Sequence, residues 1–303
     1  MNKDIIWTDL TKEEIVEKLA KEGIKASKTV IKKLLRKYGY RRRKAKKTKT
    51  MGESKDRNEQ FENISLLRSY YETTGNPIIS IDTKKKEYIG NFYRDGKLLT
   101  KEDIEVYDHD YSSFADGIVI PHGIYDLKRN SGYINIGVSK DTSEFACDCI
   151  RQWWYDVGKK LYLNATSILV LCDGGGSNSS RYYIFKEDLI KLVDELGIEI
   201  RIAHYPPYTS KYNPIEHRLF PHITRACQGA IFKSVNLVKK LIMKTSTKTG
   251  LTVKVNIIDK IYQTGREVAK GFKETIHENS QIIFHEILPN WNYSVVPMNM
   301  EII

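Results

Sequence analysis

Near the start of the chain, apolar residues recur at helical spacing in two short segments. A capping pattern that opens at Thr11 predicts a helix over residues 12–21, which Gly23 ends. Ser27 then begins a second amphipathic helix, which Gly39 ends. Two short helices joined by a glycine-containing turn are typical of a helix-turn-helix unit, and a generic helical hairpin has the same spacing.

Further along, short apolar runs of strand length alternate with helical patterns. The run from Ser167 to Cys172 is apolar throughout its centre, so we expect it to be buried on both faces of a sheet. Arg94 to Lys97 have the composition of a hairpin turn. The predicted strands cover residues 77–82, 88–92, 118–125, 133–138, 167–172 and 198–203. The predicted helices cover residues 61–71, 142–160, 183–196 and a segment from Pro214.

This order of elements predicts the fold class. Strands followed by helix, strand, helix, strand and helix are the order of a ribonuclease H-like mixed sheet flanked by helices, which is an α/β fold. With 303 residues and 41% hydrophobic content, the chain is long enough for one such domain and a small N-terminal helix-turn-helix unit.

The net charge of +11 is concentrated near the N-terminus. Residues 1–60 contain 19 Lys and Arg against 9 Asp and Glu, and the rest of the chain contains 30 against 29. Such a basic segment attracts a polyanion by counterion release, although a solvated tail is the alternative reading. The candidate DNA-binding side chains lie on the second helix and in the run after it: Lys28, Lys32, Lys33, Arg36, Arg41, Arg42, Arg43 and Lys44.

The four cysteines form no C-x-x-C pair, which argues against a zinc knuckle and a disulfide framework and favours a reducing cytoplasm. No apolar run approaches the roughly 18 residues of a membrane helix. We therefore expect a cytoplasmic protein without a membrane partner.

Three acidic residues stand where α/β proteins place their chemistry. Asp82 and Asp173 directly follow apolar strands, at the rim of the predicted sheet. Asn213 can cap the helix that begins at Pro214, which places Glu216 in the first turn of that helix. Taken singly, each acid also fits a turn residue or a capping carboxylate. Together they predict three carboxylates that converge.

Converging carboxylates suit phosphoryl transfer. Hard oxygen ligands hold Mg²⁺, and two such ions about 3.5 to 4 Å apart activate the attacking oxygen and stabilise the leaving oxygen. Repulsion among the carboxylates is expected to raise the pKa of at least one of them in the metal-free protein.

With these residues identified, the chain resembles the Rhodopirellula-type DDE transposases of bacterial insertion sequences. The resemblance runs from about Trp7 to the end of the chain. It is carried by the motifs IDTKKKE (81–87), GNF (90–92), CDGGGSN (172–178) and HYPPYTSKYNPIEHRLF (204–220), the last being the most specific.

The resemblance implies a ribonuclease H-like catalytic domain with Asp82, Asp173 and Glu216 as catalytic and metal-binding residues. Two Mg²⁺ or Mn²⁺ ions, cutting at transposon ends and strand transfer to target DNA are implied with it. The implied partners are double-stranded DNA and a second copy of the chain on that DNA, in a nucleoid-associated bacterial protein. Residues that support the site are then expected among Asn178, His204, Lys211, Asn213 and His217.

The resulting domain prediction has four parts. Residues 1–45 form the helix-turn-helix unit, 46–60 a basic linker, 61–245 the catalytic domain, and 246–303 an extension to which the sequence assigns no role. Members of the family usually have further residues before the position of Trp7, so the DNA-binding unit is expected to be truncated. Pro221 removes a hydrogen bond within the catalytic helix and is expected to kink it.

Two other functions fit the same residues. A catalytically inactive remnant would bind DNA as a repressor, and a ribonuclease H-like nuclease would hydrolyse strands without joining them. Strand-transfer products distinguish a transposase from both.

Overall fold

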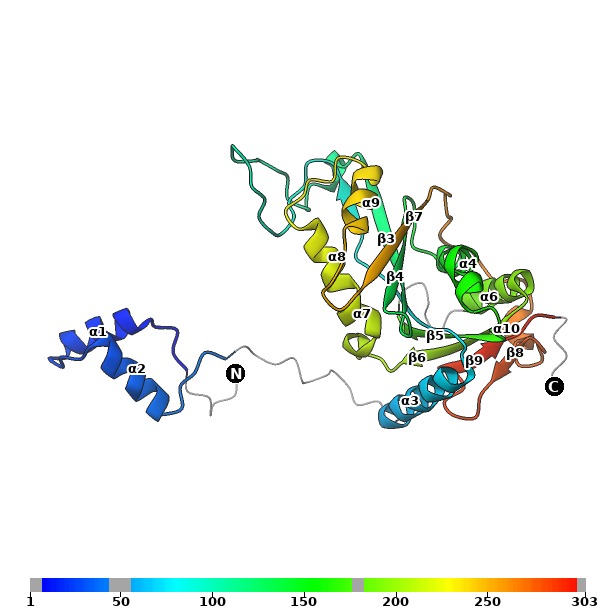
Figure 1. The fold of residues 1–303 in the computed structure, drawn as a ribbon, viewed down its shortest axis with the longest axis horizontal. Helices are drawn as coiled ribbons and strands as arrows, with labels where there is room; N and C mark the ends of the chain where they lie inside the picture. The colour runs from blue at the N-terminus through cyan, green and yellow to red at the C-terminus, as the bar shows by residue number, and fades with distance from the viewer. Residues whose placement is uncertain (1–6, 44–55, 176–182, 299–303) are drawn as a thin grey trace. The chain divides into compact units, whose positions relative to one another are not determined.

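The computed structural model describes residues 7–43, 56–175 and 183–298, and the chain divides into two units, Met1–Met51 and Gly52–Ile303 (Figure 1). Most of the predicted linker, together with Lys44 and Asn178, lies outside the described residues.

The first unit contains both predicted helices, α1 (Lys12–Lys21) and α2 (Lys28–Lys37). At α1 the capping box is complete, because the backbone of Glu14 donates to the Thr11 hydroxyl and the backbone of Thr11 donates to the Glu14 carboxylate. The Ser27 hydroxyl caps α2 by accepting from the backbone of Val30. The two helices are confirmed, and their DNA-binding role remains a prediction.

The second unit is built on one mixed sheet. Its strands are β1 (Ile78–Thr83), β2 (Glu87–Ile89), β3 (Gly117–Asp126), β4 (Ser131–Gly137), β5 (Ser167–Asp173), β6 (Glu199–Tyr205), β7 (Thr252–Ile258), β8 (Ile282–Phe284) and β9 (Asn292–Val295). The spatial order is β7-β4-β3-β1-β5-β6-β9-β8, with β2 paired to β3.

The pairing of the central strands is that of a ribonuclease H-like sheet. Strand β1 runs antiparallel to β3, and β3 runs antiparallel to β4. On its other side β1 runs parallel to β5, which runs parallel to β6. The predicted fold class is therefore confirmed for the catalytic domain.

Helices cover both faces of this sheet (Figure 1). One face packs α4 (Ser143–Trp153) and α6 (Tyr183–Leu196), with a π-helical turn (Trp154–Gly158) and α5 (Lys159–Leu161) after α4. The other face packs α3 (Arg57–Thr74), α7 (Pro214–Arg218), α8 (Phe220–Cys227) and α9 (Val235–Met243). Alternate strand residues point to the two faces, so both are apolar.

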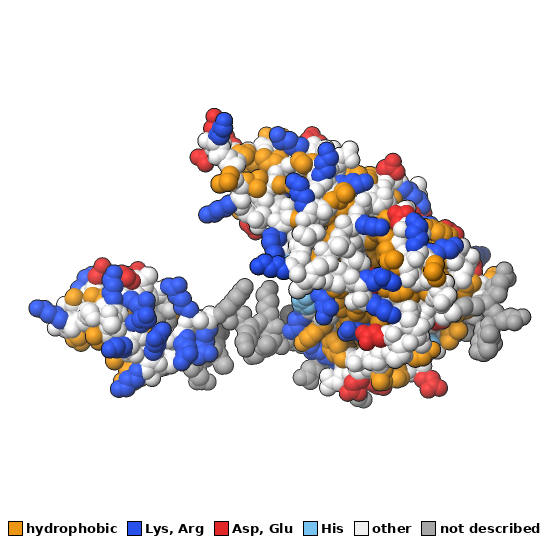
Figure 2. Space-filling model, in the orientation of Figure 1, with side chains coloured by type: hydrophobic (Ala, Val, Ile, Leu, Met, Phe, Trp, Pro, Cys, Tyr) orange, Lys and Arg blue, Asp and Glu red, His pale blue; other side chains and the backbone are white. Residues whose placement is uncertain are grey.

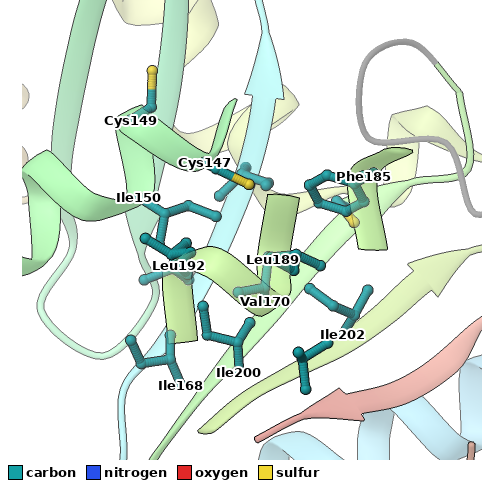
Figure 3. Close-up of a cluster of buried hydrophobic side chains, with 14 of the residues drawn as sticks. Cys147, Cys149, Ile150, Ile168, Val170, Phe185, Leu189, Leu192, Ile200 and Ile202 are labelled. Atoms are coloured by element: carbon teal, nitrogen blue, oxygen red, sulfur yellow. The ribbon is translucent and has the colours of Figure 1, made fainter. Parts of the chain in front are cut away.

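The core on the α4 and α6 face is continuous aliphatic packing. Figure 3 shows Leu189 and Leu192 of α6 above Val170 of β5 and Ile200 and Ile202 of β6. All five side chains are fully buried. Because β5 is apolar on both faces, it lies centrally in the sheet, as its composition predicts.

One local prediction is wrong. Residues 94–97 do not form a hairpin turn, because β2 pairs with β3 across a long connection, residues 90–116. Gly96 instead lies against the loop after α8, where the backbone of Gly229 donates to the carbonyl of Asp95. The glycine in this segment lets its backbone lie directly against the backbone of Gln228 and Gly229.

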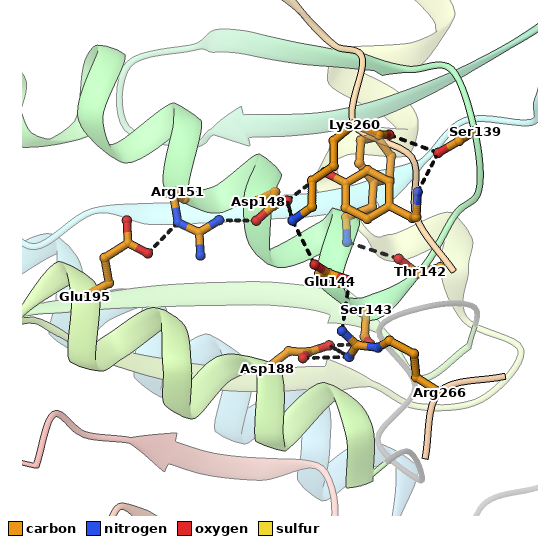
Figure 4. Close-up of polar contacts among 12 residues, drawn as sticks. Ser139, Thr142, Ser143, Glu144, Asp148, Arg151, Asp188, Glu195, Lys260 and Arg266 are labelled. Atoms are coloured by element: carbon orange, nitrogen blue, oxygen red, sulfur yellow. Dashed lines mark hydrogen bonds and ion pairs between the residues drawn. The ribbon is translucent and has the colours of Figure 1, made fainter. Parts of the chain in front are cut away.

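The C-terminal residues complete the sheet. Strand β7 extends one edge beside β4, while β9 and β8 extend the other edge beside β6. In the connection from β7 to β8, Lys260 and Arg266 form ion pairs with acids of α4 and α6 (Figure 4). The short helix α10 (Phe272–Thr275) follows in the same connection. No helix among the described residues is long and apolar enough to span a membrane.

Candidate active site

Asp82 and Asp173 lie at the same edge of the sheet. Strands β1 and β5 are parallel neighbours in which Ile78 faces Leu169 and Ser80 faces Leu171. Continued by two residues, this register sets Asp82 beside Asp173. The convergence predicted from the two strand ends is therefore a direct result of parallel pairing.

Glu216 reaches the same place from α7. Its carboxyl group lies close enough to that of Asp82 to act on it electrostatically. Burial, the interaction with Glu216 and the charge of Asp173 together raise the pKa of Asp82 to about 8. Burial likewise raises the pKa of Asp173 to about 6, with the charge of Glu216 adding to the effect and a hydrogen bond from Asn213 opposing it. The three acids thus form one electrostatically coupled group.

Two buried polar residues hold the three elements together. The Ser80 hydroxyl accepts from the backbone N–H of Ile215 at 3.0 Å and itself donates to the side-chain oxygen of Asn213. The Asn213 amide donates to the Ile81 carbonyl and to the Asp173 carboxylate, each at 3.2 Å. Asn213 stands at the N-cap position of α7, but its side chain makes no capping hydrogen bond. Ser80 supplies the cap, and Asn213 orients Asp173.

A glycine lets α7 approach the sheet closely. Gly123 on β3 faces Asp82 across the antiparallel pair. A Cβ at Gly123 would lie 2.7 Å from both Ile215 of α7 and Phe220 of α8, which is closer than side chains tolerate. Glycine at this position therefore sets how deeply α7 sits, and with it the depth of Glu216.

A pocket of about 430 Å³ opens in front of the aspartates. Its walls include Asp141 and Tyr208, the latter with a positive φ of 63°. The Thr83 hydroxyl donates to the Asp141 carboxylate at 3.2 Å. The full lining is Asp82, Thr83, Asp141, Asp173, Gly174, Gly175, Pro206, Pro207, Tyr208 and Ser210. Asp141 is a fourth acid at the site, and it was not among the candidate residues predicted from the sequence.

The donor set fits a hard divalent cation. Asp82, Asp173 and Glu216 supply only oxygen atoms, which Mg²⁺ and Mn²⁺ prefer. Within the described part of the chain no three acidic, His or Cys side chains already stand at metal-binding geometry. Burial is the main cause of the raised pKa values of Asp82 and Asp173, and the neighbouring carboxyl groups add to it. A bound cation would favour the charged form of both groups.

Of the residues predicted to support the site, His204 is fully buried on β6. Burial lowers the pKa of His204 to about 4, so its ring is neutral. Its Nδ1 lies 3.1 Å from the carbonyl oxygen of Asp173. His204 therefore cannot contact a phosphate and instead holds the backbone that carries Asp173.

Two further predicted support residues, Lys211 and His217, lie at the surface. Lys211 is exposed, with its ammonium group 5.0 Å from the centre of the Tyr212 ring. His217 is exposed directly after Glu216. In the first unit, the basic side chains Lys28, Lys32, Lys33 and Arg36 of α2 and the following Arg41, Arg42 and Arg43 are also exposed.

With the geometry of the site established, comparison with known proteins identifies the family. Residues 1–297 match the family model described as the Rhodopirellula transposase DDE domain. The chain belongs to this family. It is therefore a DDE transposase and a nucleotidyl-transfer enzyme, as the sequence motifs predict. The comparison of the sequence with curated proteins gives no match.

Solved structures of transposases are similar to this family member. A pre-cleavage Mos1 transpososome has a TM-score of 0.47 at 13% identity, over 79% of this chain and 72% of that chain. A mariner Mos1 paired end complex with Mg has a TM-score of 0.47 at 13% identity, over 79% and 73%. The catalytic domain of Mos1 mariner transposase has a TM-score of 0.41 at 13% identity, over 63% and 80%. These TM-scores lie below 0.5, so the fold assignment rests on strand order and pairing.

Proposed function

We propose that Asp82, Asp173 and Glu216 are the catalytic acids of this transposase and hold two Mg²⁺ or Mn²⁺ ions. The reaction is cleavage of DNA at transposon ends, followed by strand transfer to target DNA. The observation that carries the proposal is the parallel pairing of β1 and β5, which sets Asp82 beside Asp173, with Glu216 close enough to raise the pKa of Asp82. Three acids from three separate elements meet at one edge of the sheet.

Bound cations would activate the attacking oxygen and stabilise the leaving oxygen of the scissile phosphate. The chain contributes the placement of the acids. Asn213 orients the Asp173 carboxylate, and the buried ring of His204 fixes the backbone of Asp173. Ser80 caps α7 and so fixes the turn that carries Glu216. No protein nucleophile takes part in this reaction.

Double-stranded DNA is the proposed substrate and target, and a homodimer on DNA is the proposed assembly. The basic side chains of α2 and of residues 41–43 are exposed and suit phosphate contacts. Two copies would pair the two transposon ends. Light scattering tests this by measuring the mass of the protein–DNA complex, which should contain two protein chains.

The triad is tested by the substitutions Asp82→Asn and Glu216→Gln in the full chain. Each variant should lose detectable cleavage of transposon-end DNA in Mg²⁺, because each removes a charged oxygen ligand without changing side-chain size. Binding to the same DNA and the melting temperature should not fall, because these carboxyl groups act on metal and form no part of an apolar core.

Glu274→Gln is the matched control, since Glu274 is an exposed acid on α10. It should cleave as the unaltered protein does. The unaltered protein should be inactive in excess EDTA. Cleavage by either triad variant at the control's rate, or equal cleavage in EDTA, would overturn the assignment of the triad.

A further inference from the structure

The charge of the second unit is strongly segregated along the chain. Residues 217–258, which begin directly after Glu216, contain eight Lys and Arg and no Asp or Glu. Outside this stretch, the residues after position 60 contain 22 Lys and Arg against 29 Asp and Glu. A near-neutral total therefore conceals one basic segment within an acidic domain.

The fold gathers this segment into one surface. Helix α8 packs against α7 and α9, and α9 packs against the edge strand β7. The apolar side chains Phe220, Ile223, Val238 and Ile242 point into the core, which leaves the basic ones outside. We call this the α7–β7 basic surface, formed by Arg218, Arg225, Lys233, Lys239, Lys240, Lys244 and Lys248. Lys254 on β7 does not belong to it, because it pairs in register with Tyr133 and so points to the other face of the sheet.

Six of these seven side chains are exposed, and Lys239 is half-buried. Figure 2 shows Lys and Arg side chains over the part of the larger unit where Figure 1 draws α8 and α9. The surface adjoins the active site, because Arg218 follows Glu216 on the same helix.

The basic residues on the other face of the sheet are differently arranged. On that face, Arg151, Lys260 and Arg266 each pair with an acid of α4 or α6 (Figure 4). Lys191 pairs with Glu187 of α6. Within the described part of the chain, none of the seven residues of the α7–β7 basic surface forms an ion pair. Their charge is therefore available to an external polyanion.

We propose that the α7–β7 basic surface binds the DNA duplex that continues from the scissile phosphate held at Asp82, Asp173 and Glu216. The inference rests on the proposed function, because it takes DNA as the substrate of the adjoining site. The contacts proposed here are made to phosphates, which carry no sequence information, so this surface binds DNA without sequence preference. It positions the duplex relative to α7 and therefore relative to Glu216.

The test neutralises four exposed residues at once in the full chain: Arg225→Gln, Lys233→Gln, Lys240→Gln and Lys244→Gln. None of them touches the acids. Affinity for a DNA duplex is measured by fluorescence anisotropy across a range of salt concentrations, with EDTA present to prevent cutting. Each lost phosphate contact reduces the slope of log K against log salt by about 0.9, so the slope should fall by about two to four.

The matched control removes the same charge from exposed residues elsewhere: Lys159→Gln, Lys191→Gln, Lys270→Gln and Lys273→Gln. Its slope should stay within about one unit of that of the unaltered protein. The loss in the test variant should be equal for DNA with and without a transposon end, since phosphate contacts are independent of sequence.

Equal slopes for the test and control variants would overturn the inference. So would a loss confined to a structured RNA or an acidic peptide, which would assign the surface to another partner. Both results concern binding in EDTA and leave the cleavage test of the triad untouched. Conversely, a triad variant that still cleaves DNA would not make the salt slopes of the test and control variants equal. The two failures are therefore distinguishable.

Discussion

Ser80 shows how one hydroxyl group in an apolar strand governs the site. It is fully buried between Ile79 and Ile81, where an aliphatic side chain would pack equally well. Its hydroxyl instead satisfies the backbone of Ile215 and the amide oxygen of Asn213. Loss of the hydroxyl would leave two buried polar groups without a partner and release the start of α7.

We predict that Ser80→Ala lowers the cleavage rate about 10- to 100-fold, the usual effect of removing a partner that orients metal ligands. The free energy of unfolding should fall by about 1–3 kcal/mol. KM for DNA should stay unchanged, and the Mg²⁺ concentration for half-maximal rate should rise, because Ser80 positions the ligands and does not touch DNA. Steady-state kinetics and urea unfolding measure these effects.

Ser234→Ala provides the comparison. The Ser234 hydroxyl caps α9 by accepting from the backbone N–H of Leu237 at 3.2 Å. Ser234→Ala therefore removes a hydroxyl that caps a helix, as Ser80→Ala does, but at a place away from the site. It should lower stability by about 0.5–2 kcal/mol without changing the Mg²⁺ requirement. If the two variants require the same Mg²⁺ concentration, Ser80 contributes to stability alone and does not position the metal ligands.

At the scale of elements, the break between α7 and α8 separates two tasks. Pro221 lies in the first turn of α8, where its missing N–H costs no helical hydrogen bond. The kink predicted from Pro221 is therefore confirmed as a break at Leu219. Because of it, α7 can present Glu216 to the strand ends while α8 follows the sheet and packs Phe220 and Ile223 into the core.

The pair α1 and α2 has its own consequence. Basic residues 28–43 are exposed on a unit that clusters separately from the catalytic domain. We predict that deletion of residues 1–50 weakens binding to transposon-end DNA and flattens its dependence on salt, because it removes many phosphate contacts. Electrophoretic mobility shift at several salt concentrations measures both. An unchanged salt slope would identify the segment as a solvated tail, and an unchanged melting temperature of the deletion variant shows that the catalytic domain is intact.

At the scale of the whole molecule, the parts that follow from local rules were predictable. Parallel neighbouring strands align their carboxyl ends, which is why Asp82 and Asp173 can be paired from sequence although they are far apart in it. Glu216 followed from Asn213 and Pro214 at the start of its helix, and the family motif that contains it supports this assignment. The periodic elements of both units were also correct in type, since their apolar patterns and caps agree.

The residues that escaped prediction depend on tertiary contacts. A single Ser in an apolar strand has no periodic signature, so Ser80 gave no signal. Asp141 lines the pocket beside Thr83, a residue far from it in the sequence. The assignment of residues 94–97 to a hairpin failed because the same composition serves a loop packed against Gly229. The α7–β7 basic surface was hidden within a nearly balanced total, and an acid-free window of sequence would have revealed it.

The C-terminal strands also depend on long-range pairing. Strands β7 and β9 join opposite edges of the sheet, beside β4 and β6. Their sequences contain no feature that selects these partners. Their place in the sheet makes residues 252–295 part of the catalytic domain's framework, for which the sequence had assigned no role.

The central claim is that the three acids catalyse the transfer of DNA strands, and joining tests it more directly than cutting. A labelled transposon-end duplex with a free 3′-hydroxyl is incubated with plasmid DNA in Mg²⁺, and covalent transfer of label to the plasmid is measured. We expect joined products with the unaltered protein and none with Glu216→Gln, although both bind the duplex. Hydrolysis of the plasmid without joining, or joining by the Glu216→Gln variant, would contradict it.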